Sequence, residues 1–171
     1  MSTWGRNNEE QSPKKNWSLE EARGKLETFC SYQERCIWEL RRKLFEKGIQ
    51  GQAVDTILAE LEASGFVDEE RFARSYARGK FRIKKWGKGR ISRELKLREI
   101  SSSIIQKGLS EIDGEEYFAT IEREAEKKWE KTKEKDAYKK KYLVTHYLMS
   151  KGFEQDLIQE ALSALISKEN R

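Results

Sequence analysis

Three segments of this sequence repeat one helical pattern, and this repeat restricts the possible fold more than any other feature. The segments are RRKLFEKGI, SRELKLREI and THYLMSKGF. When their ends are superposed, Leu44, Leu95 and Leu148 coincide, so successive copies are 51 and 53 residues apart. Two further sets of positions align or nearly align: Lys47, Arg98 and Lys151, and then Val54, Ile105 and Ile158. A short helical unit cannot bury its apolar face alone, so such copies must pack against their neighbours.

The spacing of apolar residues between the copies is helical, and no alternating strand pattern is present. Ser18 and Glu21 form a capping-box pattern, and Gly48, Gly51 and Gly65 mark helix ends. Charged residues (38%) outnumber apolar residues (36%), which indicates a large surface around a thin core. We therefore expect an all-α fold of three tandem three-helix repeats in an elongated, curved, solenoid-like array. The predicted parts are a flexible tail over 1–17 and repeats over 18–65, 66–112 and 113–167.

The positive charge is concentrated in the middle repeat. Residues 68–98 contain 12 Lys and Arg against 4 Asp and Glu, whereas the net charge of the whole chain is only +5. A solvated helix face normally interleaves acids and bases, so this imbalance favours a binding surface for a polyanion or an acidic protein. The candidate partner-binding or DNA-binding residues are Arg78, Lys80, Arg82, Lys84, Lys85, Trp86, Lys88, Arg90, Arg93, Lys96 and Arg98. Gly87 and Gly89 on either side of Lys88 would let the backbone approach a phosphate or a partner closely.

Other aromatic and acidic residues have simpler interpretations. Phe72 and Tyr76 could stack on bases, but their spacing beside small residues favours a place in the core. Trp38 and Trp129 are predicted to be partly buried. Glu residues over 111–134 alternate with Lys at helical spacing, which is typical of a solvated helix with weak ion pairs.

The sequence contains no recognisable catalytic or cofactor pattern. No nucleophile–base arrangement, carboxylate pair or nucleotide fingerprint is present, and one His with two Cys offers no local zinc site. The sequence therefore argues against an enzyme and predicts no cofactor. It also lacks an apolar run of the roughly 18 residues that a membrane span needs, and a signal-peptide pattern. We expect a cytoplasmic protein without membrane contact.

The middle repeat contains the segment FVDEERFARSYARGK, and the segment WGKGRISRELKLREIS follows it. This pattern resembles the core motif of the RecX family, the regulatory partners of the RecA recombinase, and the resemblance is specific over about residues 37–107. The matching residues are Asp68, Glu69, Arg71, Phe72, Ala73, Gly87, Arg90, Ile91, Glu94 and Leu95. One departure is Arg98-Glu99-Ile100, where the family usually has Lys-Gly-Ile. If the middle residue of this turn needs a positive φ, the turn is formed here at some cost.

The resemblance implies a protein that binds the RecA nucleoprotein filament and inhibits its ATPase and strand-exchange activities, in homologous recombination, DNA repair and the SOS response. It also implies three tandem three-helix units. We expect single-stranded DNA, or a phosphate backbone in general, to be a second and weaker partner, and we expect a monomer. An alternative is a stand-alone nucleic-acid-binding protein without sequence specificity, because the three-helix units could be helix-turn-helix modules. A structural adaptor is a third reading, but it leaves the basic segment unexplained.

Overall fold

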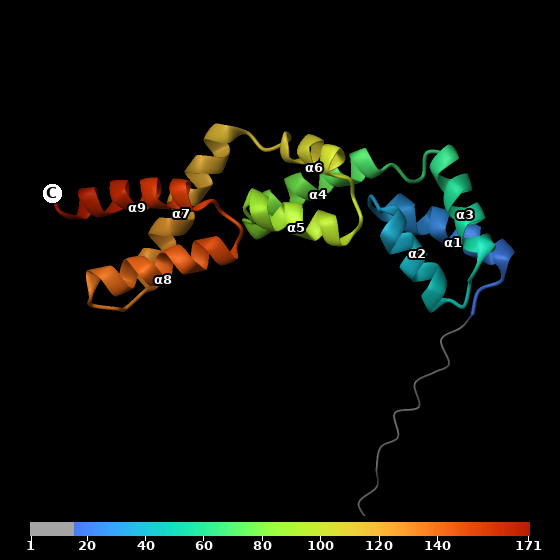
Figure 1. Ribbon diagram of the computed structural model, residues 1–171, viewed down its shortest axis with the longest axis horizontal. Coiled ribbons are helices and arrows are strands. Elements are labelled where there is room, and N and C mark those ends of the chain that lie inside the picture. The colour runs from blue at the N-terminus through green and yellow to red at the C-terminus, as the bar shows by residue number, and fades with distance from the viewer. Residues whose placement is uncertain (1–15) are drawn as a thin grey trace, which may run out of the picture. The chain divides into compact units, whose positions relative to one another are not determined.

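The computed structural model describes residues 16–171, and these residues form nine α-helices and no strand (Figure 1). The helices are α1 (Leu19–Tyr32), α2 (Ile37–Glu46), α3 (Gln52–Ala63), α4 (Glu69–Lys84), α5 (Lys88–Leu97), α6 (Ser102–Leu109), α7 (Gly114–Lys131), α8 (Ala137–Ser150) and α9 (Gln155–Glu169). The prediction of an all-α fold is confirmed. The helices group into two compact units, one up to Val67 and one over Asp68–Arg171.

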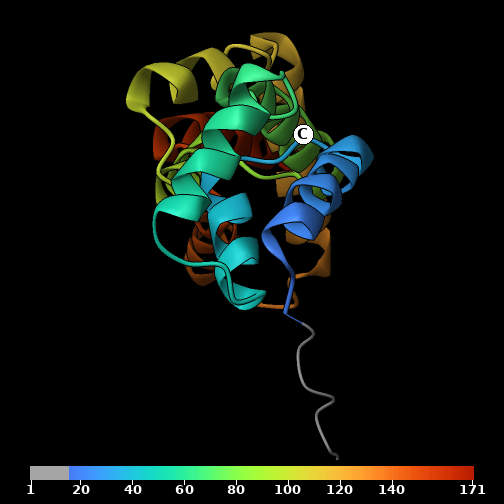
Figure 2. The ribbon, with the colours of Figure 1, turned by 90° about the vertical axis from the view of Figure 1, so that its right-hand side faces the viewer.

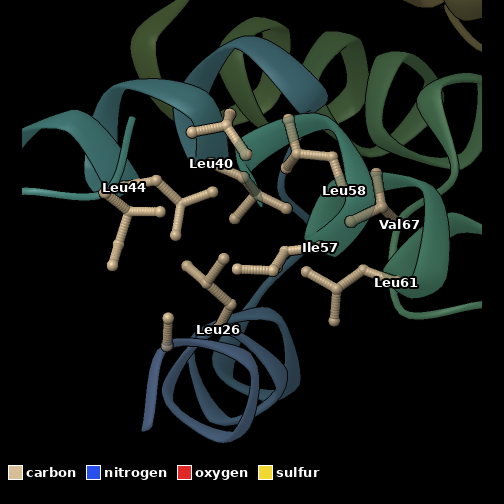
Figure 3. Close-up of a cluster of buried hydrophobic side chains, with 10 residues drawn as sticks. Leu26, Leu40, Leu44, Ile57, Leu58, Leu61 and Val67 are labelled. Carbon is tan, nitrogen blue, oxygen red and sulfur yellow. The ribbon is translucent and has the colours of Figure 1, made fainter. Parts of the chain in front are cut away.

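The first unit contains α1, α2 and α3, and α3 packs against both other helices (Figure 2). Helix α1 begins at a capping box, in which the Ser18 side chain accepts from the Glu21 backbone N–H. Apolar side chains from all three helices meet in one buried cluster (Figure 3). The side chains labelled there are Leu26, Leu40, Leu44, Ile57, Leu58, Leu61 and Val67. Trp17, which the sequence analysis assigned to the tail, also packs against this cluster; residues 1–15 lie outside the described range.

The second unit contains two sets of three helices. Helix α4 packs against α5 and α6, and α7 packs against α8 and α9. Leu44, Leu95 and Leu148 are all 0% exposed, as the repeat predicted. The next aligned set is buried as well: Val54, Ile105 and Ile158 are at most 1% exposed. The register of the repeat is therefore correct in all three copies.

The second helix of each repeat ends in the same turn. After α2, the N–H of Ile49 donates to the carbonyl of Leu44 (3.0 Å) and the N–H of Gly48 donates to that of Phe45 (3.1 Å). This pair of bonds defines a Schellman motif, which places the residue after the C-cap in the left-handed region. The same pairs follow α5 and α8. The left-handed residues are Gly48 (φ 81°), Glu99 (φ 60°) and Gly152 (φ 95°). Glu99 therefore carries the positive φ that the sequence comparison anticipated.

Replacing Glu99 by glycine should stabilise the protein. A left-handed conformation costs a residue with a Cβ about 1–2 kcal/mol, and part of this gain is offset by the greater freedom of glycine in the unfolded chain. We expect Glu99→Gly to raise the free energy of unfolding by about 0.5–1 kcal/mol in urea denaturation. Glu99→Ala is the control, because it removes the carboxylate but keeps the Cβ. If the alanine variant were as stable as the glycine variant, backbone strain at this position would be ruled out.

The apolar spacing of Phe118, Ile121, Ala125 and Trp129 predicts a long helix over roughly 115–135, but helix α7 ends at Lys131. The Asp136 side chain then caps the next helix and accepts from the Lys139 N–H (2.8 Å). The helical period also predicts that Leu19 and Leu143 belong to the apolar faces of their helices, but they are 58% and 46% exposed. Both lie at the edge of their helix face, where the 3.6-residue period alone does not separate buried from exposed positions.

Candidate interaction surface

The basic residues of the middle repeat are carried by the second half of α4 and by α5. Helix α4 begins at Asp68, whose side chain accepts from the Arg71 N–H (2.8 Å). Its first turn is acidic, and its last turn contains Arg82 and Lys84. Acids at the N-terminus and bases at the C-terminus both suit the helix dipole. This arrangement concentrates the cations at the end of α4, directly before α5.

Four of the candidate cations are exposed: Arg82, Lys84, Arg93 and Lys96. None of the four is in an ion pair with another residue in the range 16–171. Two large apolar side chains beside them in sequence, Ile83 and Leu97, are 78% and 66% exposed. We refer to the four residues as the exposed cations. They are available to an anionic partner without the loss of an internal contact.

Arg78 and Arg98, also candidates, are used in internal ion pairs. Arg78 lies 3.0 Å from Glu111, which also accepts from Arg74 at 2.9 Å. These two guanidinium groups, Arg74 more strongly than Arg78, lower the pKa of Glu111 below its usual value. Arg98 lies 3.1 Å from Glu94. Both arginines therefore help to hold the middle repeat together.

The remaining candidate cations lie close to aromatic rings or bind a carbonyl at the end of α4. Two cations lie close to the Trp86 ring: Lys80 (Nζ 5.0 Å from the centroid) and Arg90 (Cζ 4.1 Å). Lys88 Nζ lies 4.8 Å from the centre of the Tyr117 ring, and Lys85 Nζ donates to the Arg82 carbonyl at 2.7 Å. Cations at these distances are attracted to the ring faces. The positions of these side chains are therefore set by contacts within the protein.

The Gly87-Lys88-Gly89 segment makes its close contact with the third repeat. The Gly87 N–H donates to the Lys151 carbonyl (2.7 Å), and the Gly89 N–H donates to the Gly152 carbonyl (3.0 Å). A Cβ at Gly87 would lie 2.2 Å from the carbonyl carbon of Gly152. The prediction that these glycines let the backbone approach a phosphate or a partner was therefore wrong. The glycines are needed because two backbones of the same chain meet here.

Tyr117 completes this contact, and the sequence analysis did not identify it. Its hydroxyl accepts from the Lys88 N–H (3.0 Å) and donates to a carboxylate oxygen of Glu154. Its ring lies 5.7 Å from Phe81 and 5.6 Å from Phe153, centre to centre. Burial, and then the hydrogen bond to Glu154, raise the pKa of Tyr117 above its usual value. The four-residue spacing to Ile121 was the available signal, since it places residue 117 on the buried face of α7.

Two acidic residues were wrongly assigned to a solvated helix face. Glu124 is only 9% exposed, and its carboxylate lies 3.1 Å from Lys151 Nζ and 3.6 Å from Lys127 Nζ. Glu111 binds the two arginines described above. A buried carboxylate needs a cation close by. The Lys151 partner lies on another helix end, so the spacing within the 111–134 segment could not reveal it.

Residues 16–171 contain neither a metal-binding cluster nor a helix that could span a membrane. No cluster of three or more His, Cys, Asp or Glu side chains there is arranged to hold a metal ion. In the same range, every helix is too short or too polar to cross a membrane.

Comparison with known proteins identifies the family. The model of the second three-helix domain of RecX matches residues 68–109, and the model of the third matches residues 115–162. The chain is 31% identical to a regulatory protein RecX from Pelodictyon phaeoclathratiforme, over 75% of this chain and 78% of that protein. It is 32% identical to a regulatory protein RecX from Clostridium perfringens, over 77% of this chain and 62% of the relative.

A solved structure supports the fold. The crystal structure of RecX from Lactobacillus salivarius superposes with a TM-score of 0.75 at 21% identity, and the match covers 86% of this chain and 96% of that one. The family models match three-helix domains at the places where the structure has α4–α6 and α7–α9. The predicted resemblance is confirmed: this chain belongs to the RecX family of regulatory proteins.

Proposed function

We propose that this protein binds the RecA nucleoprotein filament and inhibits its ATPase and strand-exchange activities, and that it thereby modulates recombination and DNA repair. It acts as a regulatory protein and not as an enzyme, in the cytoplasm and as a monomer. Membership of the RecX family supports the choice of partner. The observation that carries the proposal is the set of exposed cations on α4 and α5, which lack acidic partners in the described range.

The repeat architecture suits a filament. The three proposed repeats, over 18–65, 66–112 and 113–167, would each contact a different protomer along the filament. Linked contacts of this kind raise the overall affinity without requiring any one contact to be strong. The exposed cations would meet an acidic surface of the recombinase or the phosphates of its DNA. In either case the attraction weakens as salt concentration rises.

Reversing two exposed cations should weaken inhibition. We expect Arg93→Glu with Lys96→Glu to raise the protein concentration needed for half-inhibition of RecA ATPase on single-stranded DNA by about tenfold, because two attractive contacts become repulsive. The helix should persist, since Lys, Arg and Glu have similar helix propensities. Circular dichroism checks this point.

The matched control is Lys168→Glu with Arg171→Glu, which makes the same change in net charge at exposed positions near the chain end. This control should inhibit like the wild type. Equal losses in both double variants would show a nonspecific charge effect and would remove the α5 cations from the mechanism. A wild-type protein that did not inhibit at all would contradict the proposed function itself.

The alternative function is stand-alone binding of nucleic acid without sequence specificity. The same exposed cations favour it, because phosphates and carboxylates both attract unpaired Lys and Arg. Titration of bare single-stranded DNA without recombinase separates the two functions. Binding to bare DNA as tight as binding to the filament would favour the alternative.

A further inference from the structure

One side of α8 carries an exposed stripe of rings. Tyr138 and Tyr142 are 81% and 55% exposed, His146 is also exposed, and Met149 is 41% exposed. These positions follow one another at four, four and three residues, so they lie on one face of the helix. The Tyr142 and His146 rings are already adjacent, with centres 4.2 Å apart. The buried side of α8 is formed by other residues: Val144, Thr145 and Leu148.

A second concentration of lysine lies at the start of this stripe. Residues 127–141 contain eight Lys against three Asp and Glu. Acidic residues on both sides hide this excess in the charge of the whole third repeat. Several of these lysines have internal roles: Lys127 faces Glu124, Lys128 lies over Tyr147, and Lys140 lies over Trp129. Four are exposed at the end of α7, in the following loop and in the first turn of α8: Lys131, Lys133, Lys135 and Lys139.

We propose that this face of α8 binds single-stranded nucleic acid, with bases stacking on Tyr138, Tyr142 and His146 and with the exposed lysines binding phosphates. Aromatic rings beside cations are the elements that single-strand-binding surfaces combine. The ring-bearing positions follow one another at about 6 Å along the helix axis. The Tyr142 and His146 rings themselves lie 4.2 Å apart, so together they form one continuous aromatic surface on which bases can stack. A duplex cannot make these contacts, because its bases are already stacked on one another and cannot stack on the rings. This proposal concerns the protein alone and does not depend on the recombinase.

The repeat supports this assignment. Position 142 of α8 is equivalent to position 89 of α5, and positions 146 and 149 are equivalent to Arg93 and Lys96, at the same separation of 53 residues. At two of these positions the middle repeat carries the exposed cations Arg93 and Lys96, so this face of the second helix is exposed in both repeats. A surface that binds another protein through apolar contacts alone would not need the lysines. A surface that binds a partner through charge alone would not need the rings.

Fluorescence anisotropy of a labelled oligothymidine of 20 nucleotides, titrated with the full-length chain, tests the proposal. We expect Tyr138→Ala with Tyr142→Ala to weaken binding at least about tenfold, because each base stacked on a ring contributes substantially to affinity. Net charge does not change, so the dependence of affinity on salt should stay the same. Tyr138→Phe with Tyr142→Phe keeps the rings and should bind like the wild type. Lys135→Gln with Lys139→Gln should instead flatten the salt dependence, by about 0.7 per lysine in the logarithmic slope.

Two controls keep the result specific. Tyr32 is 83% exposed at the end of α1, so Tyr32→Ala should leave binding unchanged. A duplex of the same length should bind the wild-type and double-alanine proteins equally. The proposal is overturned if the double-alanine variant binds oligothymidine like the wild type, or if its loss is equal for the duplex. It is also overturned if Tyr32→Ala weakens binding as much, since any exposed ring would then serve.

Discussion

Replacing Gly152 by alanine should be strongly destabilising. Gly152 has φ 95°, and a Cβ there would lie 2.4 Å from the Arg90 backbone nitrogen and 2.5 Å from the Arg90 Cβ. The alanine would therefore suffer both a strained backbone conformation and a clash with α5 that no side-chain rotation can relieve. We expect the free energy of unfolding to fall by about 3 kcal/mol or more, the sum of these two costs.

Two comparisons separate strain from clash. Gly65 also has a positive φ, 77°, but a Cβ there would meet nothing within 4 Å, so Gly65→Ala should cost only about 1 kcal/mol. Glu99→Gly removes the same kind of backbone strain within the second unit, so it should raise the free energy of unfolding where Gly65→Ala lowers it. Hydrogen exchange would localise the damage: in Gly152→Ala the Gly87 and Gly89 amides, which donate to this turn, should lose protection. Equal losses in Gly152→Ala and Gly65→Ala would show that the backbone contact between α5 and the turn after α8 contributes nothing.

This contact marks the limit of what the sequence could predict. The period of 51 and 53 residues correctly placed the buried leucines and the turns that follow them, because each repeat applies the same local rules. The sequence also identified Glu99 as an exception in its turn. It could not show which backbones meet between repeats. Gly87 and Gly89 were recognised as sites of close approach, but the partner was misassigned, since nothing local distinguishes a phosphate from another turn of the same chain.

The candidate cations show the same division. Charge counting found the segment that holds them, and the structure then separated exposed members such as Arg93 from members such as Arg78 that form internal ion pairs. The deciding partner, Glu111, lies 33 residues further along the chain. Pairs across repeats or helix ends have no fixed spacing that a sequence pattern can detect. Similarly, the net charge of the third repeat did not reveal the lysines near α8, because acidic residues on both sides offset their charge.

The second large effect is expected at Leu95. This side chain is 0% exposed and lies at the C3 position of the turn after α5, where its carbonyl accepts from the N–H of the buried Ile100. Leu95→Ala removes buried methyl groups and leaves a cavity, so we expect a loss of about 2–5 kcal/mol. A loss of this size is a large fraction of the total stability of an ordinary domain.

Leu97→Ala in the same helix is the matched control. Leu97 is 66% exposed, so the identical substitution should change stability by less than about 0.5 kcal/mol. Urea denaturation of both variants, followed by circular dichroism, gives the comparison. Hydrogen exchange should show that Leu95→Ala lowers protection within residues 68–171 more than within the first unit, since the two units are compact separately. Equal stability of the two variants would mean that position 95 is not a core position. The register that aligns Leu95 with Leu44 and Leu148 would then be wrong, because all three copies depend on a buried leucine at this position.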